Sequence, residues 1–208
     1  GTLPSSPGAL MNALRTAAVA LALCPLLAHA GDFEAAAAKA ERIERLDAFL
    51  EKFIGRCTDP YTRAECEKGV ATFRKEALAR SYVVKIQEAT SLVQPQREGE
   101  GFVLLLTPFF DGGGLALTNG TPTKQDPNGN PLVALVPVKS VLPPGAMDLE
   151  FLSPFRTGAI ELEVVFQPLK AWKMPKKGGG SIEGVGAKLV AVRVLDGRTG
   201  NELGSRRM

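Results

Sequence analysis

Two carboxylates, Glu161 and Glu163, are the best candidates in the sequence for acid–base chemistry. In an extended strand such a pair shares one face, with Cα atoms about 6 to 7 Å apart, a spacing that suits carboxylates cleaving glycosidic bonds. They alternate with Ile160, Leu162 and Val164, however, as the solvated face of a strand does. We therefore expect a structural role, and a carboxylate-dependent hydrolase of envelope polymers is the alternative.

Four lysines surround the only tryptophan, Trp172: Lys170, Lys173, Lys176 and Lys177. Cations beside an exposed aromatic ring can bind acidic glycans, lipid headgroups or an acidic protein surface. The same residues are also typical of an edge strand whose lysines discourage aggregation while the tryptophan packs into the core. We prefer the second interpretation and keep the five residues as a candidate site for an anionic partner.

Asp126, Asn128 and Asn130 have the one-three-five spacing of a calcium-binding loop. Pro131 occupies the position that needs glycine, and Pro137 the position that needs a bidentate glutamate. Turn chemistry therefore explains the segment better, and no metal site is predicted. A calcium-stabilised adhesion module is a further alternative.

Two runs of three glycines, 112–114 and 178–180, could in principle cradle a phosphate. Neither run ends in the Gly-Lys-Ser/Thr of a phosphate-binding loop, and the first leads into a strand-like segment, 115–118, instead of a helix. Both are interpreted as flexible turns, and no cofactor is predicted.

Met11 to Ala30 has the three regions of a secretory signal peptide in order. A polar start holds Arg15, an apolar core of about a dozen residues follows, and Ala28-His29-Ala30 supplies the small-x-small cleavage pattern. The core is too short for a bilayer span, which needs about 20 residues. We expect residues 1–10 to be an upstream remnant and the protein to be periplasmic or secreted, with no transmembrane span after cleavage.

Cleavage after Ala30 would remove His29, the only histidine, together with Cys24. Without an imidazole, Ser-His-Asp and Cys-His catalysis and histidine-bearing zinc sites are excluded, so we do not expect an enzyme. Cys57 and Cys66 would remain in an oxidising compartment, and we predict that they form a disulfide. The net charge of +3 is too small to suggest nucleic-acid binding.

Helix-forming residues without glycine or proline run from Asp32 to about Ile54, with apolar positions three and four apart. Glu41 and Arg45 would form a supporting i, i+4 pair in this helix. Thr62 and Glu65 have the spacing of a capping box that opens a second helix, which continues to about residue 80. We predict an antiparallel helical hairpin over residues 31–80, with the disulfide clipping its loop.

After Ser81 the chain is rich in strand-forming residues broken by proline and glycine. The predicted strands are 82–87, 102–107, 115–118, 132–138, 147–152, 160–167 and 188–195, followed by a turn and a terminal hairpin strand. Segments 119–131 and 174–186 are interpreted as long exposed loops. We predict an α+β protein in which residues 81–208 form an all-β domain, an antiparallel β-sandwich or barrel.

The predicted function follows from the missing catalytic residues and the separate composition of the helical part. We expect an exported, non-enzymatic binding or structural protein of the cell envelope, with a protein or envelope component as partner. The helical hairpin would serve for docking or oligomerisation. Nucleic acid is not an expected partner.

Overall fold

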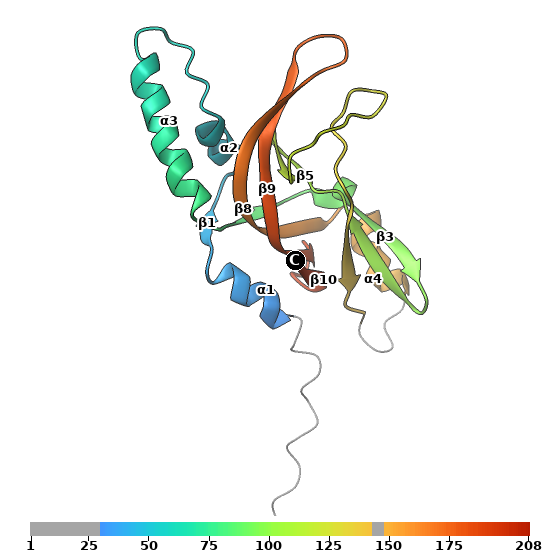
Figure 1. Cartoon of the computed structure of the whole chain (residues 1–208). Helices are drawn as coiled ribbons and strands as arrows, with labels where there is room; N and C mark the ends of the chain where they lie inside the picture. Colours follow the sequence, from blue (N-terminus) through green and yellow to red (C-terminus); the bar gives the residue numbers. More distant parts are fainter. Residues whose placement is uncertain (1–29, 143–147) are drawn as a thin grey trace, which may run out of the picture.

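The computed structural model describes residues 30–142 and 148–208, drawn in Figure 1. The predicted remnant at 1–10 and the predicted signal peptide at 11–30, including Cys24 and His29, lie outside the described residues except for Ala30, so these interpretations stay predictions. In chain order the elements are α1 (Ala30–Ala37), β1 (Glu41–Ile43), α2 (Leu46–Ile54), α3 (Arg63–Leu78), β2 (Tyr82–Ile86), the 3-10 helix η1 (Ala89–Leu92), β3 (Val93–Glu98), β4 (Gly101–Leu106), β5 (Phe109–Gly112), β6 (Leu115–Asn119), β7 (Val136–Ser140), α4 (Asp148–Arg156), β8 (Ile160–Pro175), β9 (Ser181–Asp196) and β10 (Glu202–Arg207).

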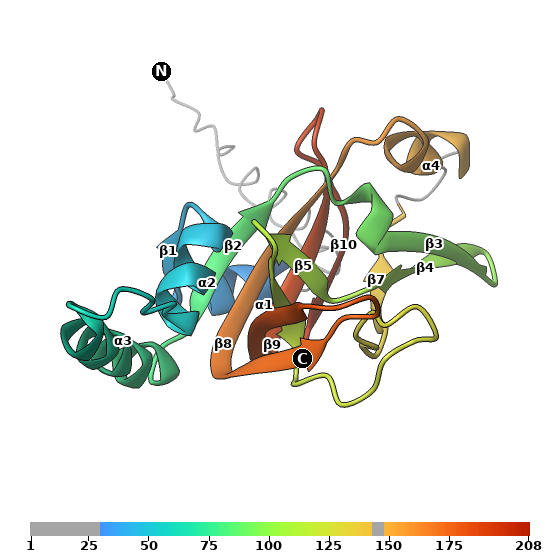
Figure 2. The ribbon, with the colours of Figure 1, turned by 90° about the horizontal axis from the view of Figure 1, so that it is seen from above.

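The strands of the described chain form one open sheet of ten strands. Eight follow the order β1-β2-β8-β9-β10-β7-β4-β3, while β6 adds to β9 and β5 to β6. Figure 2 shows β1 and β2 on one side, beside α2, and β3 and β4 on the other. The prediction of a mixed α and β protein is confirmed. The sheet is open, and its pairs β1–β2 and β6–β9 are parallel, so it is not the purely antiparallel sandwich or barrel that we expected.

The length of β8 and β9 explains why the sheet branches. The predicted strands 160–167 and 188–195 are halves of two 16-residue strands that pair along their whole length. The other edge of β9 pairs with β10 along one half and with β6 along the other half. The segment that we interpreted as a loop, 174–186, is therefore mostly hairpin, and its turn is confined to 176–180.

One face of the sheet carries the main hydrophobic core, which α2 helps to form. Phe49, Leu50 and Phe53 of α2 are buried in the same cluster as side chains from β2, β4, β6, β8 and β9. Alternate residues of β8, from Ile160 to Phe166, point into this cluster and are fully buried, as their spacing predicts. The helical and strand regions therefore share one core.

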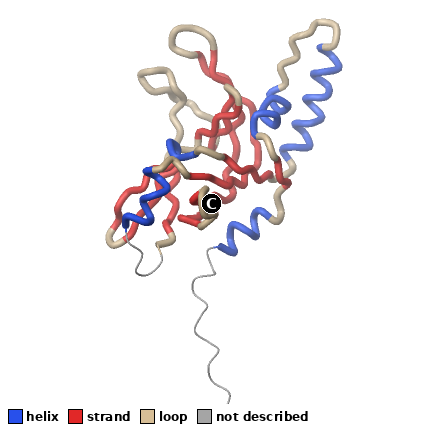
Figure 3. The backbone as a smooth tube through the Cα atoms, turned by 180° about the vertical axis from the view of Figure 1, so that it is seen from behind, coloured by secondary structure: helices blue, strands red, loops and turns tan. Residues whose placement is uncertain are grey.

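The opposite face of the sheet is covered by α1. Phe33 and Ala36 of this helix pack on Val83, Val165 and Ala191, which come from β2, β8 and β9. Figure 3, with helices blue and strands red, shows the helices arranged around the strands. Both faces of β8 are thus buried, which accounts for Val165 among its otherwise polar outward residues.

The single helix predicted from Asp32 to Ile54 is wrong, because this segment contains α1, β1 and α2. The two helices bury their apolar residues on opposite faces of the sheet, and one straight helix cannot reach both. The chain passes between the faces as β1, which pairs in parallel with β2. The predicted pair of Glu41 and Arg45 is absent, since Glu41 bonds Arg80 and Arg45 bonds Asp47.

The second predicted helix is present as α3, although its capping box does not form. The Thr62 hydroxyl donates to the Asp59 carboxylate at 3.2 Å instead of capping the helix. Arg74 of α3 donates to the carbonyl oxygens of Phe53 and Ile54, which end α2, each at 2.6 Å. These bonds and the Cys57–Cys66 disulfide, which the structure contains as predicted, hold α3 to α2.

The strand predicted at 147–152 is also wrong. Met147 lies outside the described residues, and the rest of the segment belongs to α4. Asp148 and Glu150 stand in the first turn of the helix, where negative charge is favourable. Phe151 stacks on Phe102 with the ring centroids 5.0 Å apart, so one helical face is buried. β1, β3 and β5 were not predicted.

We predict that Phe49→Ala destabilises the protein by about 3 to 5 kcal/mol, the usual cost of removing a buried aromatic ring. Phe49 contacts the rings of Phe53, Phe73, Tyr82 and Phe166 at centroid distances of 4.8 to 6.2 Å, so its loss opens a cavity between α2 and the sheet. Urea unfolding measures the change.

Tyr61→Ala is the matched control for Phe49→Ala, because Tyr61 is 96% exposed. It should change the free energy of unfolding by no more than about 0.5 kcal/mol. Equal effects of the two substitutions would contradict a core that depends on α2.

We predict that replacing both Cys57 and Cys66 by serine lowers the free energy of unfolding by about 2 to 3 kcal/mol, the value expected for a loop this short. The two cysteines are nine residues apart, and their bond restricts the unfolded chain. Urea unfolding of the double variant and of the reduced wild type should agree. If the double variant loses stability and the reduced wild type does not, the effect comes from the serine side chains and not from the missing disulfide.

Candidate functional site

The carboxylates predicted as possible acid–base residues are bound in ion pairs on the α1 face of the sheet. Glu161 pairs with Lys85 at 2.6 Å. Glu163, 8% exposed, accepts from both Nε and Nη2 of Arg193, and Arg42 lies 3.9 Å away. Both glutamates come from β8, and each is engaged by a cation from a neighbouring strand. The arrangement supports the structural role that we expected from the sequence.

Arg193 links this face of the sheet to α1. Its guanidinium also bonds Glu34 and lies 4.5 Å from the centroid of the Phe33 ring. Burial alone would lower the pKa of Arg193, but the bonds to Glu163 and Glu34 raise it above its ordinary value. The group therefore stays charged and holds α1 on the sheet.

Trp172 is buried, so its ring is not available as an exposed binding surface. The indole N–H donates to the hydroxyl of Thr118 at 3.0 Å, and the ring lies across Gly184 of β9. A Cβ at Gly184 would approach the ring to within 2.4 Å, so a side chain there would displace the tryptophan.

The four predicted lysines lie on the exposed end of the β8–β9 hairpin (Figure 1). Lys173 pairs with Glu183 at 2.7 Å, and Lys177 donates to the carbonyl oxygen of Pro127 at 3.0 Å. Lys170 and Lys176 make no ion pair within the described residues. Binding of an anionic partner by these lysines stays a prediction, and it would not use the tryptophan face.

Asp126 acts as the centre of a turn. Its carboxylate accepts from the backbone N–H groups of Asn128 and Asn130, both at 2.8 Å, and its bonds to Asn130 are the largest cause that keeps its pKa below the ordinary value. Within residues 30–142 and 148–208 no cluster of three or more histidine, cysteine, aspartate or glutamate side chains could hold a metal. The backbone hydrogen bonds to Asp126 are those of a turn.

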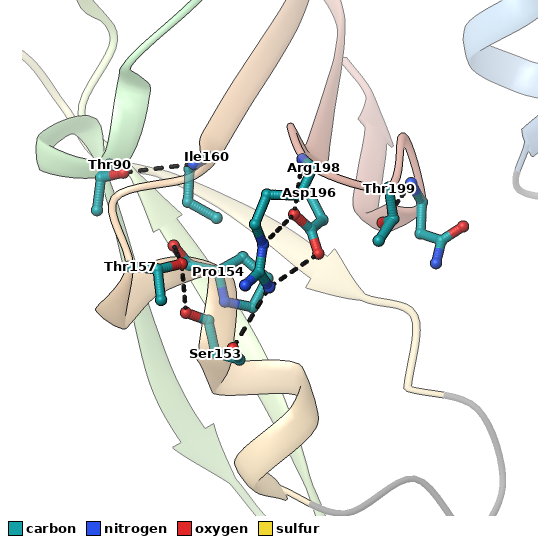
Figure 4. Close-up of polar contacts among 9 residues, drawn as sticks. Thr90, Ser153, Pro154, Thr157, Ile160, Asp196, Arg198 and Thr199 are labelled. Atoms are coloured by element: carbon teal, nitrogen blue, oxygen red, sulfur yellow. Dashed lines mark hydrogen bonds and ion pairs between the residues drawn. The ribbon is translucent and has the colours of Figure 1, made fainter.

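A second polar cluster joins the end of β9 and the β9–β10 turn to α4 (Figure 4). The carboxylate of Asp196 accepts from the backbone N–H and the guanidinium of Arg198, which also donates to Ser153 at 3.3 Å. Burial would raise the pKa of Asp196, but the bonds from Arg198 lower it below its ordinary value. These groups satisfy one another and fix the β9–β10 turn against α4.

A groove of about 510 Å³ lies where α2 and α3 meet β1 and β2. Its floor is aromatic: the ring centroid of Phe49 lies 4.8 Å from that of Tyr82 and 5.8 Å from that of Phe73. The remaining lining residues are Glu41, Ile43, Glu44, Arg45, Ala48, Lys52, Glu76 and Arg80. This combination of an apolar floor with a few polar groups is typical of ligand sites.

Tyr82 supplies a polar group within the aromatic floor. The residue is only 4% exposed and lines the groove, yet its hydroxyl makes no hydrogen bond to another described residue. Burial, followed by the nearby carboxylate of Glu41, raises the pKa of Tyr82 above its ordinary value of 10.0. The phenol therefore stays protonated and can donate a hydrogen bond into the groove.

Charged side chains surround the groove and largely balance one another. Arg80 pairs with Glu41 at 3.1 Å, and Lys52 Nζ lies 4.3 Å from the centroid of Phe73. The lining contains three acidic and three basic residues. The groove thus has an apolar floor, one phenol hydroxyl without a protein partner among the described residues, and no excess of either charge.

Sequence reasoning did not identify this groove, because its walls come from four elements. Tyr82 entered the prediction only as the first residue of the strand 82–87, and Phe73 only as part of the helix that continues to about residue 80. The single signal in the sequence was an aromatic residue beginning a strand directly after an amphipathic helix.

Residues 11–206 match the model described as "Family of unknown function (DUF6066)". No curated protein and no solved structure matches the chain. Among the described residues, no helix has the length and hydrophobicity needed to cross a membrane.

We predict that the phenol of Tyr82 ionises above pH 10 in the folded protein. The stability that this group contributes is fully present below its unfolded pKa and is lost as the pH rises through the folded pKa, because the folded state holds the proton longer. The free energy of unfolding should therefore decline more steeply above pH 10 in the wild type than in Tyr82→Phe. Parallel curves would contradict a buried phenol.

Proposed function

The chain belongs to the family of unknown function DUF6066, and from its own residues we propose that it is an exported, non-enzymatic binding protein of the cell envelope. Its ligand would occupy the groove between α2, α3, β1 and β2. The observation that carries this proposal is the hydroxyl of Tyr82, on a nearly buried residue and without a protein partner among the described residues. Among the described residues no buried side-chain polar atom lacks a hydrogen-bond partner, so solvent in the groove reaches this hydroxyl, and a ligand acceptor would take the place of that water.

The groove favours a ligand with an apolar or aromatic body, a hydrogen-bond acceptor and no net charge. The rings of Phe49 and Phe73 would contact the apolar body, and Tyr82 would donate to the acceptor. Equal numbers of acidic and basic lining residues give no preference for a strongly charged ligand.

Export is supported by the disulfide between Cys57 and Cys66, since such bonds persist mainly in oxidising compartments. The predicted signal peptide at 11–30 points to the same compartment, and we keep periplasmic or secreted as the proposed location. A disulfide that holds the two helices bordering the groove would also keep the site rigid.

The alternatives have less support. A hydrolase that uses Glu161 or Glu163 would need free carboxylates, whereas both are engaged by cations on a face covered by α1. A calcium-stabilised adhesion module would need the carboxylate of Asp126, which already accepts backbone hydrogen bonds. Neither site combines an open groove with an unpartnered donor.

The proposal is tested by titrating the full chain with N-acetyl-phenylalaninamide, an uncharged aromatic probe with two carbonyl acceptors, while recording amide chemical shifts by NMR. We expect the largest changes around Phe49, Phe73 and Tyr82. Tyr82→Phe should raise the dissociation constant about fivefold, because a hydrogen bond contributes about 1 kcal/mol.

Tyr61→Phe is the matched control, because it removes the same hydroxyl from the exposed tyrosine. This variant should bind the probe as the wild type does. Shift changes centred elsewhere, or equal affinity of Tyr82→Phe and wild type, would contradict the groove as the site.

A further inference from the structure

The strand β1 leaves one edge of the sheet open. It pairs with β2 on one side only, and no strand among the described residues pairs with its other side. Two grooves border β1: one of about 510 Å³ where α2 and α3 meet β1 and β2, and one of about 430 Å³ lined by Arg42, Ile43, Glu44, Lys85 and Gln87. At the opposite end of the sheet, β3 contains Pro95, which cannot donate to an added strand.

The backbone direction of β1 identifies which groups face the open edge. The N–H of Glu41 donates to the carbonyl oxygen of Ser81 at 2.9 Å, toward β2. Because successive residues of a strand direct their N–H and C=O groups to opposite sides, those of Arg42 face outward. Glu44 lies at a bend directly after β1, and extending the strand by one residue would turn its N–H and C=O groups to the same side. These two residues are the positions through which a further strand would form hydrogen bonds.

The side chains along this edge form a self-complementary pattern of charge. Residues 41 to 45 are Glu-Arg-Ile-Glu-Arg. When the segment is read backwards around the central Ile43, every glutamate takes the position of an arginine and every arginine that of a glutamate. In an antiparallel pair of identical edges centred on Ile43, Arg42 lies opposite Glu44, and Glu41 lies opposite Arg45. A parallel copy in register would set like charges opposite one another, which is destabilising.

The charged side chains are free enough to exchange partners. Those of Arg42 and Arg45 are 62% and 72% exposed, and Glu44 makes no ion pair within the described residues. The pairs of Glu41 with Arg80 and of Arg45 with Asp47 lie at the surface, where ion pairs contribute little. Replacing them by pairs to another molecule therefore costs little.

We propose that a second copy of this chain adds to β1 in antiparallel orientation, with a two-fold axis perpendicular to the sheet and midway between the two Ile43 residues. Arg42 and Glu44 of each copy exchange backbone hydrogen bonds with Glu44 and Arg42 of the other, and opposite charges face each other along the edge. The two sheets become one, and α2 lies on the same face in both copies. Charged residues on an edge strand can also serve to prevent pairing with other chains. In that case the protein stays monomeric, and the experiment below separates this outcome from a dimer.

Sedimentation equilibrium of the full chain, from micromolar to near-millimolar concentration, tests the proposal. The weight-average mass of the wild type should rise toward twice the chain mass. Glu44→Arg places an arginine opposite Arg42 of the second copy, and Arg42→Glu places a glutamate opposite Glu44 of the second copy. Each variant alone should raise the dissociation constant at least about tenfold.

An equal mixture of the two variants should recover the dimer. One chain then carries arginine at both positions 42 and 44, and the other carries glutamate at both, so every cross-strand pair joins opposite charges. Recovery also shows that both variants are folded, which matters for Arg42→Glu because Arg42 lies near the buried Glu163. Glu67→Arg, the same charge change on the exposed surface of α3, is the control and should dimerise as the wild type does.

Three results would overturn the proposal: a wild type that stays monomeric over the whole range, a Glu44→Arg variant that associates as strongly as the wild type, or a mixture of the two variants that stays monomeric. The test does not require a ligand in the groove. A failure here would therefore leave the proposed function standing, and a failure of the groove would leave the dimer standing.

Discussion

The structure depends on the passage of the chain from one face of the sheet to the other within the few residues between α1 and α2. Phe33 is buried on one face and Phe49 on the opposite face, so the connecting segment must go around the sheet edge. It does so as β1, which satisfies its backbone by pairing with β2. The wall of the groove and the open sheet edge both result from this crossing.

The sequence pattern predicted correctly those helices and strands in which the buried side chains recur at the period of the helix or strand itself. The alternation of Ile160, Leu162 and Val164 predicted a half-buried strand, and all three face the core. The spacing of apolar residues between Asp32 and Ile54 predicted the helix that forms at its end as α2. Each of these segments turns one periodic set of apolar residues toward the main core, which is the situation that a single periodic pattern describes.

The predictions from sequence were wrong where tertiary packing overrides the local preference for helix or strand. Glu41 and Arg45 have helical spacing and strong helix formers around them, yet pairing with β2 and burial on two faces require a strand there. Residues 148–152 looked like a strand because Leu149 and Phe151 alternate with Asp148 and Glu150, but stacking of Phe151 on Phe102 selects a helix.

The candidate sites show a similar limit. Residue type suggested Glu163 as an acid and Trp172 as a binding surface, and their partners Arg193 and Thr118 explain why both are structural. Those partners are 30 and 54 residues away in the chain, so no local pattern reveals them. The groove around Tyr82 was missed for the same reason, since its floor joins α2, α3 and β2.

The position of Trp172 has a spectroscopic consequence. As the only tryptophan, it dominates the intrinsic fluorescence of the protein, and its indole is packed on Gly184 where β8, β9 and β6 meet. Its emission therefore senses loosening at this end of the sheet. It gives no direct signal from the aromatic groove or from the edge at β1, so the molecule carries a built-in probe of one region that is separate from both proposed contact surfaces.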